Sequence, residues 1–188
     1  SLAKLAALLE ADEVGQSAHL LGFLFERQSV PSYCSDELDL IFKLPDSASY
    51  IAEHLVQRPQ VIQSLSIDAQ DKFLDYLKGK EALLPALAQL VVALSVSKSK
   101  TIREAATSFL GSLPESDALQ HLTACLQNGL SKERGFAAEL LARLFPSSIE
   151  CLEQAYAAEK QKSVQQIILT AIQRLQSIDP AQQQVQLD

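Results

Sequence analysis

The chain has 188 residues, of which 47% are hydrophobic and only 6% aromatic, with 6 Gly and 7 Pro. Leu and Ala dominate the apolar set, which favours helices, and so few turn-forming residues exclude an all-β fold with many tight turns. The formal net charge of −7 makes the whole chain a poor non-specific binder of nucleic acid. Residues 1–97 hold 7 Lys and Arg against 13 Asp and Glu, whereas residues 98–188 hold 9 against 10, so a local basic patch remains open in the second half.

Residues 1–80 have an irregular helical pattern, which we expect to be the N-terminal end of a helical stack. The apolar spacing predicts helices at 2–10, 14–28, 36–44, 47–57, 61–65 and 67–78. Pro31, Pro45, Pro59 and Gly79 lie between them, at positions where proline and glycine interrupt helices.

Residues 81–178 contain a regular pattern that repeats every 31 residues. Its first copy is the helix expected at 101–113, with the i, i+3, i+4, i+7 apolar spacing of an amphipathic helix. One step pairs Arg103 with Arg134, Ala106 with Ala137, Phe109 with Leu140, Leu110 with Leu141 and Leu113 with Leu144. A second step reaches Ile168, Ala171, Ile172 and Leu175. Repetition at a fixed step indicates stacked units that cannot bury their apolar faces alone, so Leu110, Leu141 and Leu144 should be buried between units.

A partner helix precedes each of these helices. Its apolar positions are Leu87, Leu90 and Leu94, then Leu119, Leu122 and Leu126, then Ile149, Leu152 and Tyr156. Each unit is therefore predicted to be a first helix, A, a short polar turn and a second helix, B. Segments 112–116 and 145–148 end one unit and cap the next, and Asn128-Gly129 is predicted to stop an A helix in a left-handed conformation. About six such units fit the chain, so we predict an all-α solenoid with a polar tail at 179–188.

The segment Ile102-Arg103-x-Ala105-Ala106-x-x-x-Leu110-Gly111-x-Leu113 resembles the second helix of a HEAT-type repeat. Arg134, Ala137, Ala138, Leu141 and Leu144 follow the same scheme, and the step of 31 is similar to that of short HEAT-like repeats. The third copy departs from it at Gln165 and Ile167-Ile168, which implies a divergent or terminal repeat. The resemblance covers roughly residues 81–176, and it implies a stack whose B helices line the concave side, without a particular function.

The cysteines and the location of the chain can be predicted together. Cys34, Cys125 and Cys151 are odd in number and follow no metal-ligand spacing, so we expect reduced, structural thiols in a cytoplasmic protein. No run of the sequence reaches the ~18 apolar residues of a membrane span, and the opening residues do not resemble a signal peptide. The chain starts with Ser and contains no Met, which is typical of a piece of a longer protein.

No constellation in the sequence points to catalysis or to a metal. The three histidines lie far apart, at His19, His54 and His121. A step of 30 would place His121 beside Cys151, but no third group is identifiable to orient such a dyad. Carboxylates at 36–39 and 68–71 begin predicted helices, where acidic groups stabilise free amides and the helix dipole. We expect a non-enzymatic chain with no cofactor and no small-molecule substrate.

Two surface features remain as candidate binding sites. The first is the outward face of the B helices, formed by Glu104, Ser108, Gly111, Gly135, Glu139, Ala142, Gln166, Thr170 and Gln173. Residues this small predict a shallow groove suited to a helix or an extended peptide, with ordinary solvent-facing positions as the alternative. Gly111 is expected to allow close packing at the end of its helix.

The second feature is the set of A–B turns at 97–100, 131–134 and 159–162, each with two cations two residues apart. Stacking brings successive turns within about 10 Å of each other. The candidate binding residues are Lys98, Lys100, Arg103, Lys132, Arg134, Lys160 and Lys162. The lysines could instead be ordinary solvated turn residues, and the two arginines could tie neighbouring repeats together by hydrogen bonds.

These surfaces lead to three hypotheses. The first is an interaction module or scaffold segment that binds a protein or peptide. The second is a polyanion-binding solenoid that uses the basic turns for nucleic acid or a phosphorylated partner, and the third is an enzyme whose chemistry lies outside this chain. A continuous positive ridge along Lys98, Lys132 and Lys160 would favour the second, whereas interruption by Glu133 and Glu159 would favour the first.

Overall fold

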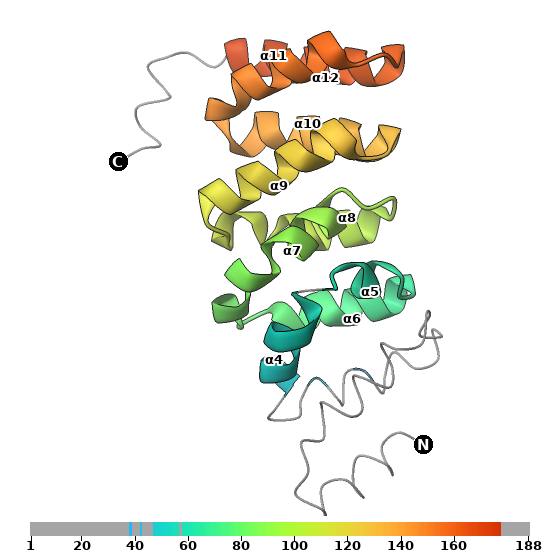
Figure 1. The fold of residues 1–188 in the computed structure, drawn as a ribbon, viewed down its shortest axis with the longest axis vertical. Coiled ribbons are helices and arrows are strands. Elements are labelled where there is room, and N and C mark those ends of the chain that lie inside the picture. The colour runs from blue at the N-terminus through green and yellow to red at the C-terminus, as the bar shows by residue number, and fades with distance from the viewer. Residues whose placement is uncertain (1–37, 39–41, 43–46, 57, 178–188) are drawn as a thin grey trace, which may run out of the picture.

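The computed structural model describes residues 38, 42, 47–56 and 58–177. Figure 1 shows their helices stacked in layers along the long axis of the molecule. No strand occurs in this part of the chain, so the all-α prediction is confirmed. The helices expected at 2–10 and 14–28, most of the one at 36–44 and the polar tail lie outside the described residues, as do His19 and Cys34.

The described part begins with short helical segments. These are α4 at Ser47–Tyr50, a π-helical turn at Ile51–Leu55, α5 at Gln60–Gln63 and α6 at Ile67–Leu77. The helix expected at 47–57 is therefore divided between an α-helical and a π-helical part. Ser66 caps α6, since its Oγ accepts a hydrogen bond from the amide of Ala69 at 3.3 Å. Gly79, with a φ of 76°, forms the predicted turn after α6.

Three pairs of helices follow. They are α7 at Ala88–Ser95 and α8 at Lys100–Thr107, α9 at Glu115–Asn128 and α10 at Ser131–Leu144, and α11 at Ile149–Ala158 and α12 at Lys162–Gln176. α7, α9 and α11 correspond to the predicted A helices, and α8, α10 and α12 to the predicted B helices. Short 3₁₀ turns flank them at Glu81–Leu83, Pro85–Leu87, Leu110–Ser112 and Pro146–Ser148. None of the helices in the described part is long and apolar enough to cross a membrane.

The buried apolar residues of all these layers form one continuous core. Leu110 and Leu141 are 2% and 0% exposed, as predicted, but the prediction for Leu144 is wrong, because its side chain is 39% exposed. The reason is that α8 gives way to a 3₁₀ turn before Leu113, whereas α10 stays α-helical through Leu144. The apolar residue before each proline, Leu113 in one copy and Phe145 in the next, takes the buried position.

The three pairs meet at two junctions that differ in which helices approach closely. At the first junction, between the α7–α8 and α9–α10 pairs, α7 packs against α9, while α8 and α10 have no extended contact. At the second junction, between the α9–α10 and α11–α12 pairs, α10 packs along α12, while α9 and α11 touch over a much smaller area. The close contact is therefore between the A helices at the first junction and between the B helices at the second.

Small residues allow α10 to approach α12. A Cβ on Gly135 would lie 3.1 Å from Cδ1 of Ile167, tight enough that the isoleucine would have to shift. Gly135 and Ala142 are both buried, so their prediction as members of the outward face is wrong: the packing of α12 on α10 covers what was taken for solvent-facing surface. The other members are exposed, namely Glu104, Ser108, Gly111, Glu139, Gln166, Thr170 and Gln173.

Two further glycines contradict the predictions made for them. A Cβ on Gly111 would meet nothing within 4 Å, so this glycine does not serve close packing. Gly129 ends α9 with φ −71° and ψ 170°, which is extended rather than left-handed backbone. Glycine is required there for space instead, because a Cβ would lie 2.5 Å from the carbonyl oxygen of Cys125.

Candidate functional site

The A–B turns of the three pairs lie along one edge of the stack, on the right in Figure 1. We call this surface the turn edge; its connecting residues are 96–99, 129–130 and 159–161. The five lysines predicted for it are exposed: Lys98, Lys100, Lys132, Lys160 and Lys162. The two candidate arginines, Arg103 and Arg134, are half-buried and have defined partners within the chain.

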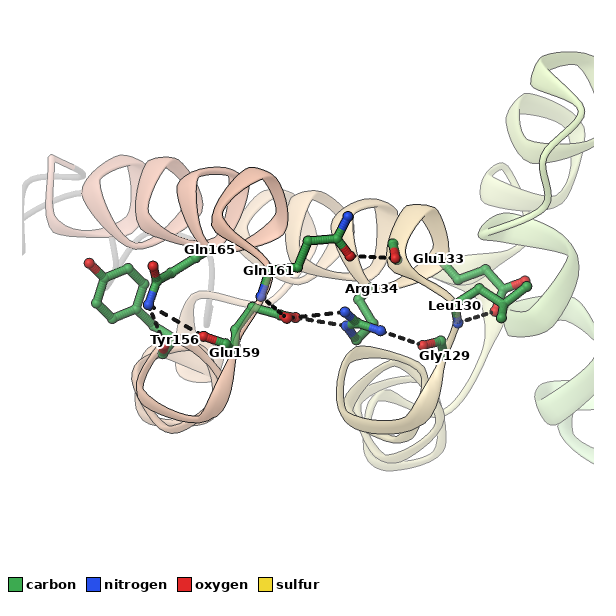
Figure 2. A network of polar contacts seen from close by, with 9 residues as sticks. Gly129, Leu130, Glu133, Arg134, Tyr156, Glu159, Gln161 and Gln165 are labelled. Atoms are coloured by element: carbon green, nitrogen blue, oxygen red, sulfur yellow. Dashed lines mark hydrogen bonds and ion pairs between the residues drawn. The ribbon is translucent and has the colours of Figure 1, made fainter.

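Arg134, in the first turns of α10, links two successive A–B turns (Figure 2). Its Nε and Nη2 donate to the two carboxylate oxygens of Glu159, at 2.7 and 3.1 Å, and its Nη1 donates to the backbone oxygen of Gly129 at 2.9 Å. The side chains of Arg134 and Glu159 are only 21% and 8% exposed, so the pair is shielded from solvent. A two-pronged contact fixes geometry as well as charge. Arg134 therefore ties neighbouring units together, which was the alternative to an anion-binding role.

Glu159 is held by further contacts in the same turn. Its Oε1 accepts from the backbone amide of Gln161 at 2.8 Å. The hydrogen bond from Arg134, the amide of Gln161 and the charge of Arg134 together hold the pKa of Glu159 below its usual range, against a smaller opposing effect of desolvation. Ser131 adds a second link across the junction, because its Oγ donates to the side-chain oxygen of Gln161 at 2.5 Å.

Arg103 occupies the same position one repeat earlier, but no described carboxylate pairs with it. Its Nη1 donates to the backbone oxygens of Ser97 and Lys98, at 2.8 and 3.1 Å. Its guanidinium carbon lies 3.9 Å from the ring centroid of Phe136 on α10, in a cation–π contact. Arg103 thus reaches the next helical pair through an aromatic ring rather than through an ion pair.

Gln165 occupies this position in the third copy. Its Nε2 donates to the backbone oxygens of Tyr156 and Glu159, at 3.3 and 3.5 Å. All three copies therefore place a long side chain that donates to a backbone oxygen of the A–B turn before its own B helix. An amide suffices for that contact, which explains how the third copy can depart from arginine and keep the same turn.

Carboxylates interrupt the positive charge of the turn edge. Oε2 of Glu133 accepts from the amide of Leu130 at 2.8 Å, and Glu159 pairs with Arg134. Lys100 lies 3.7 Å from Glu104 in an exposed pair of the kind that contributes little in solvent. Three acidic residues, Glu104, Glu133 and Glu159, thus stand among the cations of this edge.

Leu130 projects from the middle turn of the edge and was not singled out from the sequence. Its side chain is 59% exposed, more than that of Ile67 (56%) or Leu144 (39%), the other large apolar residues exposed in the described part. Its amide is satisfied by Glu133, so a leucine can stand where a polar capping residue is usual. The available signal was a lone leucine in a turn of otherwise small and polar residues.

A groove of about 530 Å³ opens beside the turn edge where α9 and α11 diverge. It is lined by Leu126, Gln127, Arg134, Gln154, Ala155, Ala158, Glu159 and Lys160. The structure thus brings two of the predicted binding residues, Arg134 and Lys160, to one cavity. Sequence reasoning missed this groove because it depends on the spacing between two A helices, which the repeat pattern does not specify.

The groups with catalytic chemistry are scattered. No cluster of three or more His, Cys, Asp or Glu side chains that could hold a metal occurs in the described residues. His121 lines a small cavity of about 190 Å³ together with Asp117, while the sulfur of Cys151 lies 3.4 Å from Oγ1 of Thr123. Burial, helped by the charge of Glu133, raises the pKa of Cys125 to about 11.

No protein-family model, characterised protein or solved structure matches the chain. The described part of the chain is a stack of paired helices with a polar turn edge.

Proposed function

We propose that the chain is a non-enzymatic interaction module, an α-solenoid segment of short HEAT-like repeats that binds a protein or peptide through its turn edge. The observation that carries this proposal is the 59% exposure of Leu130 among the lysines of that edge. Protein interfaces combine an apolar contact with a polar, charged rim. A phosphate backbone gains nothing from an exposed leucine, so this combination suits an acidic peptide with an apolar residue better than a nucleic acid.

The solenoid assignment is supported by the repeated contact at the head of each B helix. Arg103, Arg134 and Gln165 stand 31 residues apart, and each donates to a backbone oxygen of the A–B turn before its own B helix. A shared contact at a shared step is what stacked copies of one unit would show. The alternation of close A and close B contacts departs from a uniform HEAT-like curvature and leaves a groove on the A side.

The two carboxylates of the turn edge are bound within the chain, which also supports a partner that brings its own carboxylates. Glu133 binds the amide of Leu130, and Glu159 binds Arg134 and the amide of Gln161. Both carboxylates are therefore engaged within the chain, while Lys98, Lys132, Lys160 and Lys162 have no described ion-pair partner.

Peptide display tests this function without a known partner. A library of random peptides is selected on the immobilised chain, and the enriched peptides are compared with those selected on a Leu130→Ser variant. We expect peptides that combine acidic and apolar residues, and we expect their binding to fall with Leu130→Ser. The matched control is Ile67→Ser, which removes a side chain of similar exposure on α6. Enriched peptides that bind all three proteins equally would exclude the turn edge as the binding face.

The second candidate function is polyanion binding, favoured by the five exposed lysines of the turn edge. The variant that tests it replaces Lys98, Lys100, Lys132, Lys160 and Lys162 with Ser, each a surface change of about 0.5 kcal/mol or less. If single-stranded DNA binds the unmodified chain, its affinity should fall steeply with salt, and the variant should lose roughly one unit of salt slope per contact. We expect no binding at roughly tens of micromolar in low salt, which leaves the protein-binding function.

A further inference from the structure

Arg103 and Arg134 occupy the same position in successive repeats. Arg134 binds a carboxylate, whereas no described carboxylate binds Arg103. In both side chains Nη1 donates to a backbone oxygen of the A–B turn that precedes its own B helix. In Arg134 the other two donors, Nε and Nη2, hold the carboxylate of Glu159. Among the described residues, nothing accepts a hydrogen bond from the same two nitrogens of Arg103.

The free donors of Arg103 are accessible and held in place. Oγ of Ser148 is the single fully buried side-chain polar atom without a hydrogen-bond partner in the described part of the chain. Nε and Nη2 of Arg103 accordingly are not fully buried, although they have no described partner. The guanidinium carbon lies 3.9 Å from the ring centroid of Phe136, and Nη1 donates two hydrogen bonds that restrict the rotation of the group. A donor fork that is oriented before its ligand arrives loses little conformational freedom on binding.

The chain cannot fill this fork in the way it fills the other one. Glu159 is the first residue after α11, and the equivalent residue after α9 is Gly129. A Cβ at Gly129 would lie 2.5 Å from the carbonyl oxygen of Cys125, so a glutamate does not fit there. The neighbouring Asn128 turns its side-chain amide to the backbone oxygen of Ala124, at 3.3 Å.

The charge around the Arg103 fork favours an anion. Lys98 supplies one of the carbonyls that tether Arg103, and its own side chain is exposed. Lys132 lies one helical turn before Phe136, on the same face of α10. Of the nearby acids, Glu104 pairs with Lys100, and Glu133 binds a backbone amide. Glu133 keeps its charge, and Lys98 and Lys132, on the two elements that meet at the fork, have no described ion-pair partner.

We propose that the Nε–Nη2 fork of Arg103 is a receptor for a carboxylate of a partner protein, supplied by an Asp or Glu side chain. This inference rests on the proposed interaction function and names the chemistry that its partner must bring. A carboxylate is assigned, rather than a phosphate, because the equivalent fork of Arg134 holds a glutamate. Lys98 and Lys132 beside the fork favour a segment with several acidic residues.

The first test uses the unmodified chain, labelled with ¹⁵N, and follows the Nε–H signals of its arginines. The probe is a hexaglutamate peptide, and hexaglutamine is the uncharged control. We expect a saturable shift of the Arg103 signal with hexaglutamate alone. The Arg134 signal should stay in place, because Glu159 already occupies its fork. An unmoved Arg103 signal, or equal movement of both arginines, would overturn the proposal.

A second test separates the fork from its charge. Arg103→Lys keeps the positive charge but removes the two parallel donors, so hexaglutamate should bind about tenfold more weakly, the effect of one charge-assisted hydrogen bond. Arg143→Lys makes the same chemical change at an exposed position near the other end of α10 and should leave the affinity unchanged. Circular dichroism of both variants checks that the helices are intact. Equal affinities for all three proteins would show that charge alone binds the peptide.

Competition identifies the anion and separates this proposal from the function on which it rests. Acetate, inorganic phosphate and a single-stranded oligonucleotide are each added to the complex with hexaglutamate. If phosphate or the oligonucleotide displaces the peptide while acetate at equal charge does not, the carboxylate assignment is wrong. If displayed peptides bind the Arg103→Lys variant as well as the unmodified chain, the interaction function stands and the fork does not. If no peptide is selected but hexaglutamate still shifts the Arg103 signal, the fork stands and the interaction function fails.

Discussion

The first and second junctions each contain an arginine at the same repeat position, but their helices pack differently. At the second junction Arg134 forms an ion pair with Glu159, and Gly135 allows α10 to pack against α12. At the first junction Arg103 rests on Phe136, and α8 and α10 have no extended contact. The close contact shifts to the A helices there, between α7 and α9.

The residues next to the repeated arginine differ between the two junctions. One step before Gly135 the chain has Glu104, which is exposed. Where the B helices close, the A helices diverge and the groove between α9 and α11 opens. The same alternation leaves the Arg103 fork open at the first junction and fills the Arg134 fork at the second.

The largest expected effect concerns α10, the helix that takes part in both junctions. Leu141 is fully buried, so Leu141→Ala should lower the free energy of unfolding by about 2–5 kcal/mol, as large-to-small core changes do. Leu144→Ala, on the same helix but at a 39% exposed position, should change it by about 0.5 kcal/mol or less. Urea unfolding measures both values. Comparable losses for the two variants would mean that α10 is rotated from the orientation described here.

The difference between the junctions can be tested by placing a leucine at the equivalent position of each one. Gly135→Leu should push α10 from α12 and cost about 1–3 kcal/mol, because its Cβ already lies 3.1 Å from Ile167. Glu104→Leu, one repeat earlier, should stay within about 0.5 kcal/mol, since Glu104 is exposed. The comparison is again made by urea unfolding. Equal free energies of unfolding for the two leucine variants would contradict the difference between the junctions.

The ion pair of the second junction predicts a dependence on pH that the first junction lacks. The pKa of Glu159 is lowered in the folded chain, so its contribution is fully present above its ordinary pKa of about 4.3 and is lost as the pH falls through the lowered value. Glu159→Gln should therefore destabilise the chain by about 1–3 kcal/mol near neutral pH. This difference from the unmodified chain should shrink below about pH 4.

Arg103→Gln provides the control at the first junction. Arg103 has no described carboxylate partner, so the cost of its removal should be nearly the same across this acidic range. Urea unfolding of the three proteins at several pH values measures both effects. A constant cost for Glu159→Gln, or a cost of Arg103→Gln that disappears in acid, would contradict the assignment of the carboxylate to Arg134 alone.

Much of the helical order was predictable, because it depends on local apolar spacing. The α6 helix and the order of A and B helices follow from that pattern, and so does the burial of Leu110 and Leu141. The exposure of Leu144 shows its limit: a 3₁₀ turn in one copy and an unbroken α-helix in the next shift the buried position by one residue, from Leu144 to Phe145. A fixed step of 31 cannot express such a difference.

The candidate site was predictable only as a set of exposed cations. The lysines of the turn edge were found because charge in a turn is visible in the sequence. The partners of Arg103 and Arg134 were not, since Phe136 and Glu159 lie 33 and 25 residues further along the chain and meet these arginines only through the stacking. The burial of Gly135 was missed for the same reason, because it depends on α12.

The last prediction is chemical, has no consequence for the packing of the junctions, and concerns the end of α9, the A helix common to both junctions. Burial, with the charge of Glu133, raises the pKa of Cys125 to about 11, so at pH 8 its thiolate fraction is about two orders of magnitude below that of an ordinary exposed cysteine. A variant with Cys34→Ser and Cys151→Ser leaves this thiol alone for iodoacetamide labelling. We expect labelling to be slower by about that factor and to reach the rate of a free thiol in denaturant. Fast labelling without denaturant would show that the end of α9 opens readily.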